Sequence, residues 1–380
     1  MIKKLIFYFL NSVYNVKLHF TNSRMINAKI VFLKNKKKLK LYPLDKFKPI
    51  VVNYPGFTKS DKLWLDFFYS IRGIAEEEYI PLTYYYNFIE PCLNDFSSIS
   101  NIQDKNFYEL YFKDIKTPKV ILRRMNGIFY NSHYENINLN NKEISTLFRD
   151  YERIILKPSI ESGSGKSILL FERINNELIS EKEILNIEFL NRYGKDFVIQ
   201  EFVKQHPFFK RFNPTSNNTL RVFTYRSIKD DSINILHILL RIGKSGSFLD
   251  HDNLGGVGIS IKDSHLFDEF AYDGNGEKYS SINNINFKEA GKVPFIEETS
   301  TMAIKIAEKI FYSRLLAMDF TVDENGTVLL IEINCWGNGI TQYQMNNGSL
   351  FNKFTKEILD YCYSVSQNKI SVKFQVSLKK

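Results

Sequence analysis

The strongest constraint on the fold lies near the end of the chain, where two apolar runs flank an acidic turn. The runs are residues 315–320 and 328–333, and the turn is Asp323-Glu324-Asn325-Gly326. Two apolar runs joined through an Asn-Gly turn predict a β-hairpin. The sequence therefore fixes at least one antiparallel pair of strands in this part of the chain.

The same hairpin carries three polar side chains that suit a metal ion. Glu332 and Asn334 share one face because a strand places alternate side chains on one side, and an even register across the turn adds Asp319. Carboxylate and amide oxygens are hard ligands that suit Mg²⁺, which takes its other oxygens from water and from the phosphates of a nucleotide. A structural explanation stays open, in which Asp319 caps the strand and Glu332 is solvated at an edge.

Length and charge limit the size of the fold and the class of partner. A chain of 380 residues is long enough for roughly two or three lobes with a cleft between them. A net charge of +9 could favour nucleic acid, an anionic membrane surface or anionic substrates. The clustered lysines lack the Arg and Gly residues of RNA-binding tails, so we expect a solvated basic loop and no nucleic-acid partner. These lysines are Lys34, Lys36, Lys37, Lys38 and Lys40.

Cysteine usage and the N-terminus indicate the compartment. Cys92, Cys335 and Cys362 lie far apart and predict a reduced, cytoplasmic protein. Residues 5–10 are apolar like a signal peptide, but polar residues follow without a cleavage site, and the run is too short to span a bilayer. We expect an amphipathic N-terminal helix that packs on the body, with peripheral contact to the inner membrane face as the alternative. The sequence does not indicate an oligomeric state.

Changes in residue composition and hydrophobic pattern divide the chain into four segments. Residues 1–45 form a basic helical lead-in, 46–150 an N-terminal α/β lobe, 151–365 a unit of β-rich runs and glycine loops, and 366–380 a C-terminal tail. The third segment predicts mostly antiparallel sheet. Its clearest helix is expected at residues 301–311, with Ser300 as the N-cap.

A glycine loop at residues 161–167 ends in Gly-Lys-Ser and resembles a P-loop at first sight. Its spacing excludes that motif, because Ile160 stands where the upstream glycine is required and the residues after Ser167 are β-like rather than helical. A loop between two strands can still fold over a triphosphate, since glycine and serine have little bulk. Lys157, on the strand before it, favours phosphate binding over an ordinary connector.

Together these elements resemble the ATP-grasp superfamily, and most of all its sugar-transfer-associated branch found with surface-polysaccharide genes. The resemblance covers about residues 105–345 and rests on the order and spacing of several elements. It implies an α+β ATP-grasp fold, with two α+β lobes gripping ATP after an N-terminal α/β lobe. The elements are Ile155–Pro158 with its glycine loop, Val198–Val203, Asn217–Arg221, Arg241–Gly243, Asn253 with Gly255–Gly256, and the hairpin Asp319–Asn334.

The resemblance also implies ligands and residue roles. ATP and one or two Mg²⁺ ions, with Mn²⁺ as an alternative, are the expected cofactors. The residues expected to bind the nucleotide are Lys105, Lys157, Ser164, Gly165, Glu201, Phe202 and Val203. Those expected to hold the metal are Asp319, Glu332 and Asn334. The expected catalytic residues are Arg221, Arg241 and Asn253, with Asp250, Gly255 and Gly256 in the loop that faces the acceptor.

Several of these side chains have structural explanations as well. A lysine such as Lys105 is often only solvated, whereas Arg241 stands among apolar neighbours and needs an anionic partner. Cys335 follows the metal site, and a packed thiol is favoured over a nucleophile. His206 and His251 are expected in solvated loops rather than as bases.

The activity implied by the resemblance is an ATP- and Mg²⁺-dependent carboxylate-amine ligase that acts through an acyl-phosphate, in capsule or O-antigen biosynthesis. Its substrates would be small-molecule or lipid-linked carboxylates and amines. The alternatives are a sugar kinase on the same fold, with Asp250 as base, and a non-catalytic nucleotide-binding scaffold. Cys335-Trp336-Gly337-Asn338-Gly339 replaces the Pro-Gly turn of D-alanine-D-alanine ligases, so their acceptor pocket cannot be transferred to this chain.

Overall fold

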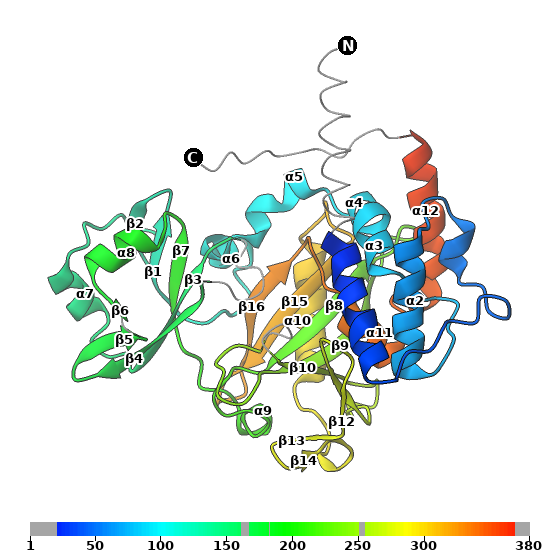
Figure 1. Ribbon diagram of the computed structural model, residues 1–380. Helices are drawn as coiled ribbons and strands as arrows, with labels where there is room; N and C mark the ends of the chain where they lie inside the picture. The colour runs from blue at the N-terminus through cyan, green and yellow to red at the C-terminus, as the bar shows by residue number, and fades with distance from the viewer. Residues whose placement is uncertain (1–20, 161–166, 182, 251–254, 369–380) are drawn as a thin grey trace.

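The computed structural model describes residues 21–160, 167–181, 183–250 and 255–368. Two seven-stranded sheets form its framework, and they lie side by side with helices against their outer faces (Figure 1). A group of helices from residues 21–93 and 341–368, called the helical group below, packs beside the second sheet. Among the described residues, no helix is long and apolar enough to cross a bilayer.

The first sheet has the strand order β2-β1-β7-β3-β4-β5-β6, and every neighbouring pair is antiparallel. Its helices α7 (Asn141–Leu147) and α8 (Ile187–Tyr193) bury Ile144 and Leu190 against the apolar side of the strands. The strands are β1 (Val120–Met125), β2 (Ile128–Asn131), β3 (Arg153–Pro158), β4 (Leu169–Ile174), β5 (Glu177–Ser180), β6 (Glu183–Ile184) and β7 (Phe197–Glu201). The sheet therefore includes residues 120–131, which the sequence placed in the N-terminal segment; the four-segment division stays a prediction.

The second sheet has the order β12-β11-β10-β9-β8-β15-β16 and is antiparallel throughout. Strands β13 (Ser281–Ile282) and β14 (Ile285–Asn286) form a separate small hairpin. The sheet strands are β8 (Thr219–Arg226), β9 (Ile233–Ile242), β10 (Val257–Ser260), β11 (Ala271–Asp273), β12 (Lys278–Tyr279), β15 (Leu315–Val322) and β16 (Val328–Asn334).

The two faces of the second sheet are covered differently. Alternate residues such as Val222 and Met318 pack on one face against helix α10 (Ile296–Glu308). On the other face, Phe223 and Ala317 pack against the helical group at one end of the strands. Further along the same face the alternation brings polar residues instead, because residues two apart point the same way. This polar part of the face faces the first sheet.

The helical group is rich in buried aromatic side chains, and the helix at residues 21–35 packs on it through Ile26, Ile30 and Leu33. The amphipathic helix that the sequence predicts around residues 5–10 lies outside the described residues. Helix α2 (Lys59–Arg72) starts with a capping box at Thr58 and ends at Gly73, whose φ of +73° favours glycine. The other helical segments of this group are η1 (Ile50–Asn53), α3 (Leu82–Tyr84), η2 (Tyr85–Ile89), α4 (Glu90–Leu93), α11 (Thr341–Asn347), η8 (Asn352–Phe354) and α12 (Thr355–Asn368). The helical segments elsewhere are α5 (Phe96–Ile99), η3 (Ser100–Gln103), η4 (Lys105–Phe107), α6 (Tyr108–Tyr111), α9 (Pro207–Lys210) and η7 (Phe287–Glu289).

One predicted helix boundary was wrong. Helix α10 starts at Ile296, with Phe295 at the N-cap position, so Ser300 lies inside the helix and does not cap it. Ile296 and Thr299 are buried and extend the apolar side by more than a turn beyond the predicted start. Glu297 and Glu298 occupy the first turn, where negative charge interacts favourably with the helix dipole.

Candidate functional site

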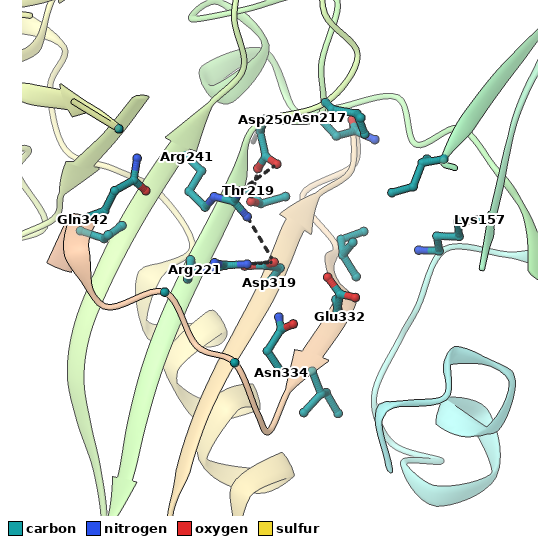
Figure 2. A pocket seen from close by; sticks show the side chains of 18 of the residues that line it. Lys157, Asn217, Thr219, Arg221, Arg241, Asp250, Asp319, Glu332, Asn334 and Gln342 are labelled. Carbon is teal, nitrogen blue, oxygen red and sulfur yellow. Dashed lines mark hydrogen bonds and ion pairs between the residues drawn. The ribbon is translucent and has the colours of Figure 1, made fainter. Parts of the chain in front are cut away.

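A cavity of about 950 Å³ lies between the two sheets and is large enough for a nucleotide with a second small molecule. Strands β3 and β7 line it on one side, and β8, β9, β15 and β16 line it on the other. The helix at residues 21–35 and helix α11 close the end that is remote from β7. Figure 2 shows Lys157 facing the polar residues of the second sheet across this space.

The predicted hairpin is present as β15 and β16. Asp319 lies directly opposite Glu332, and Asn334 lies opposite Ala317, so the three polar side chains share one face. A β-bulge at this point brings Ile331 as well as Glu332 into the cavity wall. The alternation of residues therefore predicted which side chains meet, and the bulge adds an apolar contact that it did not predict.

Asp319 is the centre of a charged layer on the second sheet. Arg221 donates from Nε to Asp319 Oδ1 at 2.6 Å and from Nη2 to Oδ2 at 2.5 Å. Arg241, the predicted buried cation, lies 3.4 Å from the same carboxylate and 3.7 Å from Asp250. Burial lowers the pKa of Arg221, but its ion pair with Asp319 outweighs burial and holds the pKa above the usual value. This layer is close to charge balance without a ligand.

Lys105 contacts the cavity residue Glu332 although it is distant in sequence from the hairpin. Its ammonium group donates to Glu332 Oε1 at 2.6 Å, and its side chain is 3% exposed. Burial raises the pKa of Glu332, but the charge of Lys105 and its hydrogen bond outweigh burial and lower the pKa below the usual value. The structure thus brings Lys105 and Glu332 together, and their roles toward a nucleotide and a metal stay predictions.

Lys157 faces the cavity from β3, on the opposite side from Asp319. Burial and the nearby charge of Lys105 lower its pKa to about 7, against a smaller opposing effect of Glu332 and Asp319. Within the part of the chain that the structure describes, Lys157 has no ion-pair partner. A buried lysine of this kind gains most from an anionic ligand.

Residues 201–203 form the wall of the cavity at the end of β7. Glu201, Phe202 and Val203 all line it, and the apolar Ile155 and Ile331 approach from the two sheets. The guanidinium group of Arg153 lies 3.9 Å from the centroid of the Phe202 ring and holds that ring in place. The amides of Glu201 and Phe202 already donate to the carbonyls of Lys119 and Arg153. The remaining backbone groups of the segment, beside apolar walls, suit a flat heterocyclic base.

Three predicted site residues, Ser164, Gly165 and Asn253, lie outside the described residues, as does His251. The strands on either side of the glycine loop, β3 and β4, are an antiparallel pair, which confirms the strand-loop-strand order. Gly255 lines the cavity beside Asp250, which accepts a hydrogen bond from Thr219.

The donor set suits Mg²⁺ in its chemistry. Asp319, Glu332 and Asn334 offer hard oxygen ligands on one face. No group of three or more His, Cys, Asp or Glu side chains is arranged as a metal site within the described ranges, so the amide of Asn334 would have to complete the set. Two buried polar atoms in the cavity wall, Asn334 Nδ2 and Asn217 Oδ1, have no hydrogen-bond partner among the described residues. Both are available to a ligand.

Sequence reasoning missed several residues of the cavity. Thr219 precedes Arg221 by two positions in β8, so the alternation of that strand could have identified it. Gln342 and Tyr343 come from helix α11, and Tyr343 stacks on Phe223 with ring centroids 5.0 Å apart. No local pattern marks them, because their place depends on how α11, which follows β16 directly, packs against the distant strand β8.

Two candidate reactive side chains have structural roles. Burial raises the pKa of Cys335 to about 12, so its thiol stays protonated and packs, as expected. The His206 ring accepts a hydrogen bond from the amide of Phe208 at the start of helix α9 and does not line the cavity.

Comparison with known proteins identifies the family that this geometry belongs to. The family described as sugar-transfer associated ATP-grasp matches residues 86–359, well over half of the chain. No curated protein matches the chain.

Solved structures resemble the chain at low identity. N5-carboxyaminoimidazole synthetase from Staphylococcus aureus, solved with ADP, is 11% identical with a TM-score of 0.41, and the match covers 70% of this chain and 54% of that one. For D-alanyl-alanine synthetase A from Vibrio cholerae the values are 14%, 0.37, 71% and 65%. For the biotin carboxylase domain of 2-oxoglutarate carboxylase from Hydrogenobacter thermophilus, in complex with MgADP, ADP and bicarbonate, they are 14%, 0.40, 73% and 48%. The chain thus spans about half to two thirds of the length of these structures.

Proposed function

The chain belongs to the sugar-transfer associated ATP-grasp family, and from this premise we propose that it is an ATP- and Mg²⁺-dependent ligase that joins a carboxylate to an amine. The predicted family and α+β fold are confirmed by the match. The observation that carries the proposal is the arrangement of three basic side chains, Lys157, Arg221 and Arg241, around Asp319, Glu332 and Asn334 in one cavity. A fourth, Lys105, is bonded to Glu332 in the cavity wall.

The proposed nucleotide site follows the length of the cavity. The backbone of Glu201, Phe202 and Val203 would face the adenine, whose flat ring fits between Ile155 and Ile331. Lys105 and Lys157 would bind the α- and β-phosphates, and the glycine loop with Ser164 and Gly165 would close over them. A bound phosphate would supply the negative charge that Lys157 lacks among the described residues.

The proposed chemistry needs charge stabilisation more than covalent catalysis. The substrate carboxylate attacks the γ-phosphate of ATP, ADP leaves, and an amine then displaces phosphate from the acyl-phosphate to form the amide. Asp319, Glu332 and Asn334 would hold Mg²⁺, which neutralises charge that develops on the phosphoryl group. Arg221 and Arg241 would face that phosphoryl group, while Asn253 and Asp250 would lie toward the acceptor.

The family description links the protein to sugar transfer, and we extend this to surface polysaccharide biosynthesis. A carboxylate or amine on a sugar or lipid-linked sugar would then be one substrate. We further propose a cytoplasmic enzyme, with peripheral contact to the inner membrane face as the alternative. Each of these assignments goes beyond what the cavity itself requires.

Released phosphate tests the activity. Purified protein is incubated with ATP, Mg²⁺ and pools of amino acids and uronic acids, with Asp319→Ala and Glu332→Ala as controls. Phosphate release that needs both a carboxylate and an amine supports the ligase. A phosphorylated sugar formed without an amine supports the kinase alternative, for which Asp250 would be the base. Tight ATP binding without turnover in any pool supports either the scaffold or an acceptor outside the pools, such as a lipid-linked sugar.

A further inference from the structure

A polar stripe on one helical segment holds the loop that follows the proposed metal site. Elements α3, η2 and α4 form a continuous helical run over residues 82–93. Tyr86 and Glu90 lie within this run and Asn94 is its C-cap residue; the three form the stripe because they contact the same loop. The segment Tyr85–Ile89, which includes Tyr86, is π-helical, a local widening that is common at functional sites.

Each member of the stripe bonds a different backbone group of the loop at residues 335–339. Asn94 Nδ2 donates to the carbonyl of Cys335 at 2.6 Å, and the Tyr86 hydroxyl donates to the carbonyl of Gly337 at 3.4 Å. Between them, Glu90 Oε1 accepts from the amide of Asn338 at 3.0 Å and from the hydroxyl of Tyr85 at 3.1 Å. Hydrogen bonds from side chains, rather than pairing with a strand, therefore fix the conformation of the loop.

The position of this loop gives the stripe its functional meaning. Asn334, a proposed metal ligand, immediately precedes the loop, and Trp336, Gly337 and Gly339 line the cavity. Tyr86 lines the same part of the cavity. This wall lies away from residues 201–203, on the side where the second substrate would bind.

The stripe costs stability, so packing alone does not account for it. Glu90 is 1% exposed, and its Oε2 atom has no hydrogen-bond partner within the described chain. The same holds for Oδ1 and Nδ2 of Asn338, which is 3% exposed. Burial raises the pKa of Glu90 to about 7, although the amides of Asn338 and Gly337 oppose the shift. Unpartnered buried polar groups are unfavourable, and apolar residues would pack here at less cost.

We propose that Glu90 is a positioning residue, which fixes the loop 335–339 and thereby shapes the wall that faces the second substrate. The inference rests on the proposed function only for the identity of that substrate. Glu90 touches no reacting atom; it acts through the backbone of Asn338. Tyr86 and Asn94 hold the two flanking parts of the same loop.

Hydrogen-deuterium exchange of the full chain tests this assignment directly. In Glu90→Leu the amide of Asn338 loses a bond to a carboxylate, so exchange of the peptide containing residues 335–339 should quicken about 10-fold or more. Glu90→Gln keeps an acceptor for that amide and should restore slow exchange. The affinity for ATP, measured by calorimetry without Mg²⁺, should stay within about two-fold in both variants, because the proposed contacts with adenine and phosphates do not include the loop.

A second readout uses the fluorescence of Trp336. Trp64 is fully buried in the helical group, so a Trp64→Phe background leaves Trp336 as the reporter of the loop. Acrylamide quenching should increase in Glu90→Leu and not in Asp66→Leu, a control that loses a buried acceptor for the amide of Tyr42 far from the loop. Should Glu90→Leu fail to fold, Asn94→Ala tests the neighbouring contact by the same measurements.

Two results would overturn the assignment. One is exchange and quenching of the loop that stay unchanged in Glu90→Leu. The other is faster exchange in Glu90→Gln as well as in Glu90→Leu, which would show that the Glu90 side chain acts by packing and not as an acceptor for the amide of Asn338. The loop measurements need no ATP. A wild-type protein that fails to bind ATP would therefore refute the proposed function without deciding the role of Glu90.

Discussion

The two sheets that face the cavity carry their charges in opposite ways. On the second sheet, Arg221 is paired through two hydrogen bonds with Asp319, and this ion pair holds its pKa above the usual value. On the first sheet, Lys157 is buried without an ion-pair partner among the described residues, and burial lowers its pKa to about 7. One side of the cavity is neutralised before a ligand arrives, and the other side is not.

This difference assigns different tasks to the two sides. A phosphate that reaches Lys157 supplies a missing counter-charge, so binding there relieves a cost that the fold already bears. A ligand at Asp319 must instead share a carboxylate that Arg221 already occupies. We therefore expect the first sheet to contribute chiefly to nucleotide affinity, and the second sheet to respond to the charge that develops during the reaction.

The largest effect is expected for Asp319→Asn. The substitution removes a proposed metal ligand and the counter-ion of Arg221, so phosphate release should fall about 10²- to 10³-fold. The free energy of unfolding should also fall, by up to about 3 kcal/mol, because Arg221, whose side chain is 19% exposed, loses its doubly bonded ion pair. Glu324→Gln, in the exposed turn of the same hairpin, is the control. Equal activity of the Asp319→Asn and Glu324→Gln variants would show that Asp319 has no role in the reaction.

Lys157→Met should separate stability from binding. The unfolded chain holds a proton on Lys157 up to about pH 10.5, whereas the native lysine gives it up near pH 7, so native stability should rise with pH between these values. The variant should lack this slope and gain up to about 5 kcal/mol at pH 6. Its affinity for ATP should fall about 10-fold or more.

Urea unfolding at several pH values and calorimetry with ATP measure these effects. Lys195→Met, which changes an exposed lysine beside the same sheet, serves as the matched control. A variant that loses stability at pH 6 would show that Lys157 is already compensated, and the contrast between the two sheets would then fail.

Local patterns predicted the parts of the site that lie within one strand or one hairpin. Alternation placed Asp319, Glu332 and Asn334 on one face, and the apolar neighbours of Arg241 predicted the anionic partner that the structure shows. The family and fold followed from the order of such elements. Residues such as Tyr343 were missed because their place depends on how distant segments pack. The strand period of two residues and the helix period of 3.6 residues carry no information about such packing.

The pairing of Lys105 with Glu332 shows the same limit. The two residues are far apart in sequence, and the motif marked each of them without indicating that they touch. The bulge at Ile331 depends on the register between β15 and β16 and not on composition. The roles of these residues toward ATP stay predictions until binding is measured.

A smaller effect follows from the pKa of Lys157 near neutral pH. Phosphate binding should raise that pKa, so ATP binding at pH 7.5 should be accompanied by uptake of at most about one proton. Calorimetry in HEPES and in Tris buffer measures this uptake, because the two buffers differ in ionisation enthalpy and neither supplies a phosphate. Uptake should disappear in Lys157→Met. Equal heats in both buffers for the wild type would place the phosphates away from Lys157.

The smallest expected effect concerns the adenine end of the cavity. Arg153→Met removes the guanidinium group that lies over Phe202, a contact worth about 0.5–1 kcal/mol at a partly exposed site, so ATP affinity should fall only a few-fold. Arg153 also pairs with Glu172 at 2.9 Å, and Glu172→Gln removes that ion pair while leaving the ring contact. If Arg153→Met alone weakens ATP binding, the ring contact orders the segment 201–203. Equal loss in both variants would assign the effect to the surface ion pair, and the first sheet would then act on the nucleotide through Lys157 and not through Phe202.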